Sequence, residues 1–119
     1  LKLMRECGMH IGIHGYEHVW MGNLPVEDMK SQIDKIHKAL SEGGCIDSGN
    51  WTMSYPYGSW HDEMIDYISQ MGCKAGFLSQ VGRAYINSKE RYKIVRYDTI
   101  DFPPRGNRYL DAEKLEAYK

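Results

Sequence analysis

The sequence predicts an α/β fold with parallel strands. Two amphipathic segments with helical spacing alternate with short apolar segments, and this alternation is typical of consecutive βα units. A proline opens the first of these helices, and a turn with proline and glycine separates the second from the strand before it. The chain of 119 residues shows no internal repeat, so we treat residues 1–119 as one domain.

The elements of the first half follow from local residues. Leu1–Cys7 reads as the end of a helix, which Gly8 terminates. Met9–His14 is predicted to be a strand, because isoleucines alternate with small or polar residues and each glycine would cost a helix about 1 kcal/mol. Pro25 suits the first position of the next helix. Its apolar residues recur every three or four positions and two glycines end it: Val26, Met29, Ile33, Ile36, Leu40, then Gly43 and Gly44.

The second half repeats the order of strand, turn and helix. Trp51–Tyr55 is predicted to be a strand that ends in the turn Pro56-Tyr57-Gly58. Ser59 is the expected N-cap of the second helix, with Asp62 in the capping-box position. The remaining predicted elements are strands at Cys73–Ser79 and Lys93–Tyr97, and a terminal helix or tail at Leu110–Lys119.

Composition excludes several classes of partner. A net charge of −1 and a pI near 6.6 provide no basic field for nucleic acid or an acidic membrane. No apolar run approaches the ~18 residues of a membrane span. The three cysteines, Cys7, Cys45 and Cys73, form no C-x-x-C pair, so we expect free, buried thiols. With no signal peptide in view, they slightly favour the cytoplasm, but the compartment stays unknown.

Histidines mark the expected functional site. His14 and His18 lie four residues apart around Gly15, at the end of the first predicted strand and on the loop after it. Two imidazoles that converge in this way suit a divalent metal, although such a pair is more often two unrelated residues. Ligands of parallel α/β folds gather at the carboxyl ends of strands, where Tyr57 and Asp98 also fall. The sequence therefore predicts one shared site.

Three motifs resemble those of one enzyme family. H-G-Y-E-H, from His14 to His18, resembles the H-S/T-x-x-H motif of the polysaccharide deacetylases (carbohydrate esterase family 4, NodB-like domain), with Gly15 in place of Ser or Thr. Ser54–Gly58 is similar to the family's R-x-P-Y-G, and Asp98–Phe102 is similar to D-x-x-D-W. Their order and spacing agree with the family's.

The resemblance implies part of a distorted (β/α) barrel with fewer than eight strands. It implies metal-assisted removal of N-acetyl, or sometimes O-acetyl, groups from a carbohydrate, with zinc as the expected metal on His14 and His18. The backbone N–H of Tyr57 would bind the oxyanion, Asp98 matches an acidic position, and Arg96 is a candidate substitute for the family's arginine, which is Ser54 here. The expected sugar-binding residues are Tyr16, Trp20, Tyr55, Pro56, Gly58 and Trp60.

Two family motifs are missing from the sequence. The T-F-D-D motif, source of the third metal ligand and the catalytic base, is absent, so we expect an amino-terminally truncated portion that is inactive alone. Such a portion would associate with a complementary segment or with another copy of itself. The L-x-H motif of the general acid is also absent, and His10 and His61 are weak substitutes. Two alternatives stay open: a non-catalytic carbohydrate-binding domain, and a metal-dependent hydrolase of another amide.

Overall fold

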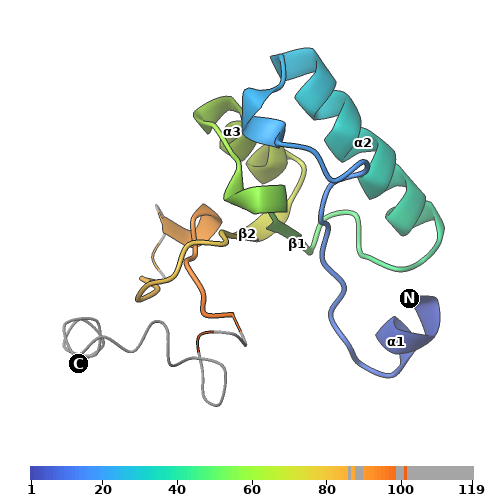
Figure 1. Ribbon diagram of the computed structural model, residues 1–119. Helices are drawn as coiled ribbons and strands as arrows, with labels where there is room; N and C mark the ends of the chain where they lie inside the picture. Colours follow the sequence, from blue (N-terminus) through green and yellow to red (C-terminus); the bar gives the residue numbers. More distant parts are fainter. Residues whose placement is uncertain (86, 88–89, 99–100, 102–119) are drawn as a thin grey trace.

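Two parallel strands lie at the centre of the structure, a computed structural model that describes residues 1–85, 87, 90–98 and 101 (Figure 1). Strand β1 (Trp51–Ser54) pairs with β2 (Cys73–Phe77), and Met53 lies opposite Gly76. On the outer sides of this pair, Ile13 forms a parallel bridge to Met53 and Ile94 forms one to Phe77. Four segments therefore lie side by side in chain order, and they are parallel, as the sequence predicts.

The two outer segments pair less extensively than predicted. Met9–His14 contributes the single bridge at Ile13, whose N–H donates to the Thr52 carbonyl at 2.8 Å. Gly12 lies so close to β1 that a β-carbon there would be 2.8 Å from Thr52 Oγ1. Lys93–Tyr97 likewise pairs through Ile94 and not as a full strand. The predicted terminal helix at Leu110–Lys119 lies outside the described residues.

Helices α2 (Val26–Glu42) and α3 (Asp62–Gln70) pack together beside the strands (Figure 1). In α2 the predicted apolar stripe is confirmed from Met29 onward, because Met29 and Ile33 are buried and Ile36 and Leu40 are half-buried, whereas its first residue, Val26, is exposed. The core joins these helices to the strands and to the loops beside them. It consists of Ile13, Met21, Met29, Ile33, Ile46, Trp51, Met53, Tyr55, Met64, Ile68, Cys73, Leu78 and Tyr92.

The predicted N-cap of the second helix is wrong. His61 is the N-cap of α3, and the backbone N–H of Met64 donates to its Nδ1 at 3.2 Å. The hydroxyl of Ser59 instead accepts a hydrogen bond from the N–H of Gly22 at 2.9 Å. Ser59 therefore connects the loop before α2 to the turn after β1, which a local capping rule does not foresee.

The amino-terminal helix α1 (Lys2–Glu6) buries no residue. It connects to the rest of the chain through Arg5, whose Nη1 donates to the carbonyls of Gly44 and Ile46 at 3.1 and 3.0 Å. No helix of the described residues is long and apolar enough to cross a membrane.

All three cysteines are free, as predicted, but their burial differs. Cys73 is buried, and this burial raises the pKa of its thiol to about 11. Cys45 is half-buried and Cys7 is exposed, so the expectation of three buried thiols is wrong for Cys7.

Candidate functional site

His14 is held at the carboxyl end of β1. Its Nδ1 lies 2.7 Å from the carbonyl oxygen of Ser54. A carbonyl can only accept, so this Nδ1 carries the proton and a neutral His14 keeps its lone pair on Nε2. Zinc-binding histidines commonly have this arrangement, with one ring nitrogen fixed by a carbonyl and the other facing the metal.

His18 lies on the loop that follows. Gly15 has a φ of 75°, which turns the chain sharply, and His18 itself has a φ of 54°, an uncommon conformation for a residue with a β-carbon. These turns bring the rings of His14 and His18 to a centroid separation of 4.8 Å. The predicted convergence of the two histidines is therefore what the structure has.

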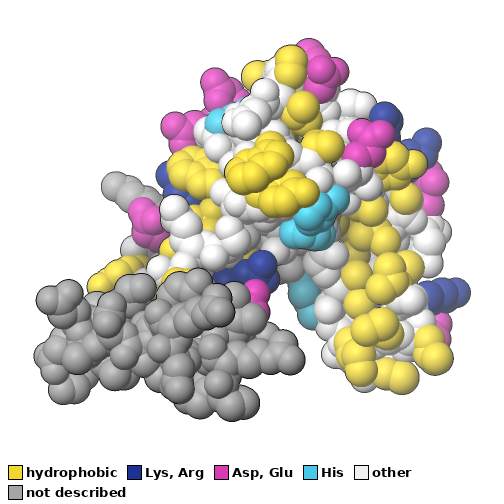
Figure 2. All heavy atoms as spheres, in the orientation of Figure 1, with side chains coloured by type: hydrophobic (Ala, Val, Ile, Leu, Met, Phe, Trp, Pro, Cys, Tyr) yellow, Lys and Arg dark blue, Asp and Glu magenta, His cyan; other side chains and the backbone are white. Residues whose placement is uncertain are grey.

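Tyr57 and Trp20 continue the row of rings. The ring of Tyr57 lies edge-on to His18 with a centroid separation of 4.7 Å, and Trp20 stacks on Tyr57 at 4.5 Å with the two planes 5° apart. Trp20 is 54% exposed and Tyr57 is 49% exposed. Figure 2 shows histidine side chains beside large hydrophobic side chains on this face. The site thus combines two imidazoles with an exposed aromatic surface.

The backbone of Tyr57 is also available to a ligand. Tyr57 has a φ of 57° in the short helical turn η2 (Pro56–Gly58). The turn is closed by hydrogen bonds from Gly58 N–H to the Tyr55 carbonyl and from Ser59 N–H to the Pro56 carbonyl. Within the described part of the chain, the N–H of Tyr57 donates no hydrogen bond. It can therefore donate to an oxygen that a substrate brings.

The two histidines fit part of a metal site. Two imidazoles on one zinc ion, each with an N–Zn distance of ~2.1 Å, have ring centroids about 5 Å apart, close to the 4.8 Å observed. Among the described residues, no group of three or more His, Cys, Asp or Glu could hold a metal ion. The pair therefore fits two positions of a metal site, and the described residues place no third His, Cys, Asp or Glu with it.

The other predicted sugar-binding residues lie in different surroundings. The ring of Tyr16 is exposed and lies 5.7 Å from Nζ of Lys35 on α2, whereas the half-buried ring of Trp60 lies 4.1 Å from Nζ of Lys93. Neither belongs to the row of rings around His18. A sugar that stacks on Trp20 would therefore have Tyr57 as its aromatic neighbour, and not Tyr16 or Trp60 as we expected.

Tyr55 and Pro56 are buried, so their side chains do not form a sugar-binding surface in this structure. Tyr55 is 1% exposed, and its hydroxyl donates to the carbonyl of Tyr92 at 2.8 Å. This burial raises the pKa of Tyr55 above its usual value. Tyr55 supports the turn from the core, whereas Pro56 and Gly58 belong to the turn itself, Gly58 with a φ of 69°.

Arg96 and Asp98 follow the segment that pairs with β2. Arg96 has an exposed side chain, and its backbone N–H donates to the carbonyl of Gln80 at 3.0 Å. The N–H of Asp98 donates to Asp101 Oδ2 at 2.7 Å, and the N–H of Asp101 donates back to the Asp98 carbonyl. The first and fourth residues of the D-x-x-D motif thus close a turn. Roles for Arg96 and Asp98 in the reaction stay predictions.

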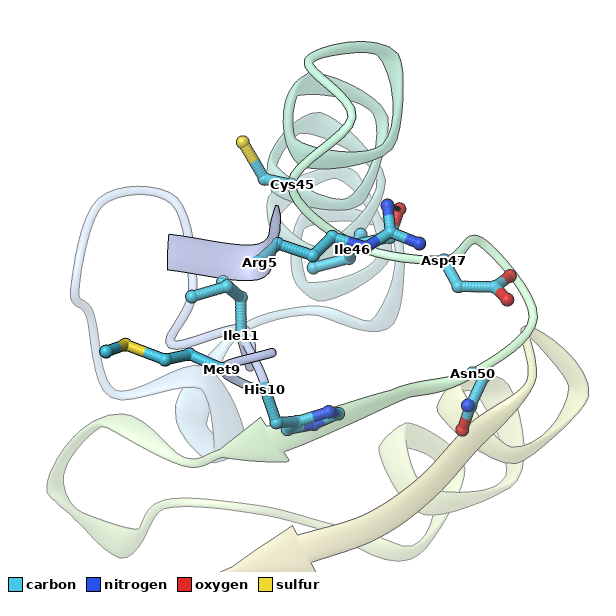
Figure 3. Close-up of a pocket in the computed structure, with 8 residues that line it drawn as sticks. All are labelled: Arg5, Met9, His10, Ile11, Cys45, Ile46, Asp47 and Asn50. Carbon is cyan, nitrogen blue, oxygen red and sulfur yellow. Dashed lines mark hydrogen bonds between the residues drawn. The ribbon is translucent and has the colours of Figure 1, made fainter. Parts of the chain in front are cut away.

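The two candidate general acids, His10 and His61, form contacts away from the histidine pair. His61 caps α3 and lies 3.1 Å from the carboxylate of Glu63. His10 is hydrogen bonded to Thr52 Oγ1 at 3.0 Å. Figure 3 shows His10 lining a pocket of about 150 Å³ with Arg5, Met9, Ile11, Cys45, Ile46, Asp47 and Asn50. This pocket lies toward the amino end of β1, whereas His14 lies at its carboxyl end.

One residue of the site has no role in the sequence prediction. Gln32 is a buried polar side chain on α2, and its amide is hydrogen bonded to Glu17, the residue before His18. The sequence did contain a signal for this residue, because Gln32 lies three residues after Met29 and beside Ile33, on the apolar stripe of the helix. A polar residue on a buried face needs a partner.

Comparison with known proteins places the chain in a family. Residues 1–76 match the family described as Polysaccharide deacetylase. A search of curated proteins found no match. Among solved structures, the chain is similar to one described as Streptococcus pyogenes deacetylase PplD in complex with acetate, with a TM-score of 0.72 and 16% sequence identity.

That similarity confirms the predicted fold class. It covers 99% of this chain and 48% of the streptococcal chain, so the chain spans about half the length of that protein. The parallel strands and their two covering helices are therefore part of an α/β fold of the NodB-like type. Since the family match covers more than half of its residues, the chain belongs to the polysaccharide deacetylase family.

Proposed function

We propose that this chain supplies two metal ligands and part of the substrate surface of a metal-dependent carbohydrate deacetylase. The observation that carries the proposal is the pairing of the His14 and His18 rings at 4.8 Å, with His14 oriented by the Ser54 carbonyl. Family membership supports a hydrolytic deacetylase, and the histidine pair supports its dependence on a divalent metal, most simply zinc.

Each part of the site has a role in this reaction. When bound, a divalent cation supplies Lewis-acid activation of water and of the acetyl carbonyl. His14 would hold that cation through Nε2, the nitrogen left free by its Nδ1 hydrogen bond, and His18 would hold it through a nitrogen of the neighbouring ring. The N–H of Tyr57 is available to donate to the oxygen on which negative charge develops as an acetyl group is hydrolysed. The exposed faces of Trp20 and Tyr57 suit the apolar face of a sugar ring.

The first test is zinc binding by the histidine pair. We expect His14→Ala and His18→Ala each to weaken zinc binding about 100-fold or more, because changes to residues that merely orient ligands already cost up to about that factor. Isothermal titration gives the affinity, and the histidine ring signals in NMR show which residues bind. His10→Ala is the control, since His10 is also exposed but belongs to another pocket. Equal heats for the wild type and for the double variant His14→Ala/His18→Ala would show that the metal assignment is wrong.

A second function, carbohydrate binding without hydrolysis, is favoured by the stacked and exposed pair of Trp20 and Tyr57. We expect Trp20→Ala to weaken the binding of an N-acetylated oligosaccharide about tenfold, at the upper end of the ~0.5–1.5 kcal/mol of a lost aromatic contact. Titration with and without a chelator separates the two functions. Oligosaccharide binding that is unchanged by the chelator supports the non-catalytic function, whereas binding that the chelator weakens supports the metal-dependent deacetylase. Trp60→Ala is the control, because Trp60 lies outside the row of rings.

A further inference from the structure

Gln32 and Glu17 form a reciprocal pair of hydrogen bonds, which we call the Glu17–Gln32 pair. The backbone N–H of Glu17 donates to Gln32 Oε1 at 3.0 Å, and Gln32 Nε2 donates to the Glu17 carboxylate. Gln32 is 8% exposed and lies on α2, whereas Glu17 lies on the loop between the two histidines. One amide group thus holds both the backbone and the side chain of the same loop residue.

The pair is placed where it can control His18. Glu17 directly precedes His18, whose φ of 54° a residue with a β-carbon adopts only when its surroundings hold it there. Tyr16, His18 and Trp20 are all exposed, and the half-buried Val19 packs against the core directly after His18. Among the described residues, Glu17 is the residue of this loop that is hydrogen bonded to α2. The Glu17–Gln32 pair is therefore a hydrogen-bonded connection between the backbone before His18 and helix α2.

We infer that Gln32 is a positioning residue for the histidine pair: through Glu17 it fixes the backbone that carries His18 and so the separation of the two imidazoles. The inference rests on the proposed function, in which that separation sets the metal affinity. Groups that orient metal ligands typically change affinity by about 10–100-fold when they are removed. A merely structural role for Gln32 would change the stability of the chain and leave its intrinsic zinc affinity unchanged.

The chemistry of the pair offers a matched set of variants. Gln32→Glu places two carboxylates against each other, so the donor to Glu17 is lost and the two charges repel. Glu17→Gln keeps that donor, because the Gln32 amide can donate to an amide oxygen. The double variant Glu17→Gln/Gln32→Glu exchanges the two side chains and allows both hydrogen bonds to form again. The pair borders a cavity of about 310 Å³, and side chains of nearly equal size change its packing little.

The zinc affinity of these variants tests the inference, with urea unfolding as the measure of stability. We expect Gln32→Glu to bind zinc about tenfold more weakly, Glu17→Gln to bind within about twofold of the wild type, and the double variant to recover to within about twofold. Equal zinc affinity for Gln32→Glu and the wild type overturns the inference, and so does a double variant as weak as Gln32→Glu. A lower urea midpoint with unchanged affinity shows a structural role alone.

The metal-free protein separates this inference from the proposed function. We expect amide hydrogen exchange at Glu17 and His18 to become faster in Gln32→Glu and to slow again in the double variant, because these amides lie at the pair. If the wild type binds no zinc through His14 and His18 but exchange follows this order, then the proposed function fails and the positioning of His18 stands. If zinc binds through both histidines and exchange is the same in all variants, then the positioning role fails alone.

Discussion

Replacing Gly76 by alanine is expected to destabilise the chain by about 3 kcal/mol, because inserting a group into a well-packed core forces its neighbours to move. A β-carbon at Gly76 would lie 2.5 Å from the Tyr92 carbonyl oxygen and in direct collision with the Tyr55 hydroxyl. That hydroxyl donates to the same carbonyl at 2.8 Å. Neither group can withdraw without breaking a buried hydrogen bond. Urea unfolding of the two proteins measures the loss.

Gly49→Ala is the matched control for this prediction. A β-carbon at Gly49 would have Asp47 Oδ1 at 3.9 Å as its nearest neighbour, and the φ of Gly49 is not positive. Its stability should stay within about 0.5 kcal/mol of the wild type. If Gly76→Ala unfolds at the same urea concentration as Gly49→Ala, the packing of Tyr55 against β2 is looser than the structure has it.

The Gly76 contact also explains why the turn at the site can be rigid. Tyr55 fills the space that a side chain at Gly76 would occupy, and it directly precedes the turn that carries Tyr57. A core that holds Tyr55 therefore also holds the backbone N–H of Tyr57 in place. This is a structural contribution of Tyr55 to the site, different from the sugar contact that we expected from its aromatic side chain.

Patterns that depend on neighbouring residues predicted much of the fold. The helix that Pro25 introduces and the strand that begins at Trp51 both form where expected, because a helix or a buried strand has a local period that the sequence displays. The same period could have placed Tyr55 in the core. Trp51, Met53 and Tyr55 alternate with less buried residues, so Tyr55 points to the same side as the two buried residues before it.

Contacts between distant segments could not be predicted from local patterns. Ser59 has the residue type of an N-cap, but its hydroxyl accepts a hydrogen bond from the N–H of Gly22, which is 37 residues away. Met9–His14 has the alternation of a strand, but a strand also requires a partner in register. In this segment the bridge to β1 is formed by Ile13. Gln32 differs, because a glutamine on a buried helix face already signals a polar partner without naming it.

Two independent arguments predicted the site around His14: the resemblance of H-G-Y-E-H to a family motif, and the convergence of strand ends. Strand ends of a parallel sheet converge, which indicated that His14 and Tyr57 lie near one another. The structure joins them through His18, whose ring contacts both. Spacing alone could not give this result, since it depends on the positive φ values of Gly15 and His18, and only the first of these belongs to a residue that favours such a conformation.

Gly15→Ser is expected to destabilise the chain by about 2 kcal/mol, although Ser is a usual residue at the matching position of the H-S/T-x-x-H motif. The left-handed conformation at a φ of 75° costs a residue with a β-carbon about 1–2 kcal/mol. The new β-carbon would also lie 3.2 Å from Pro56 Cγ and 3.3 Å from Met21 Sδ, and both of those residues are buried. A turn that shifts to relieve these contacts separates His14 from His18, so zinc affinity should fall about tenfold as well.

Gly8→Ser measures the cost of the left-handed backbone conformation alone, without the close contacts found at Gly15. Gly8 has a φ of 87°, similar to that of Gly15, but a β-carbon there would have no neighbour within 4 Å. We therefore expect Gly8→Ser to lose about 1 kcal/mol and to keep the zinc affinity of the wild type. Urea unfolding and isothermal titration of both variants give the comparison. If Gly15→Ser is no less stable than Gly8→Ser and binds zinc as the wild type does, then the turn between the histidines accepts a side chain, and the tight contact of Gly15 with Pro56 and Met21 does not set the geometry of the pair.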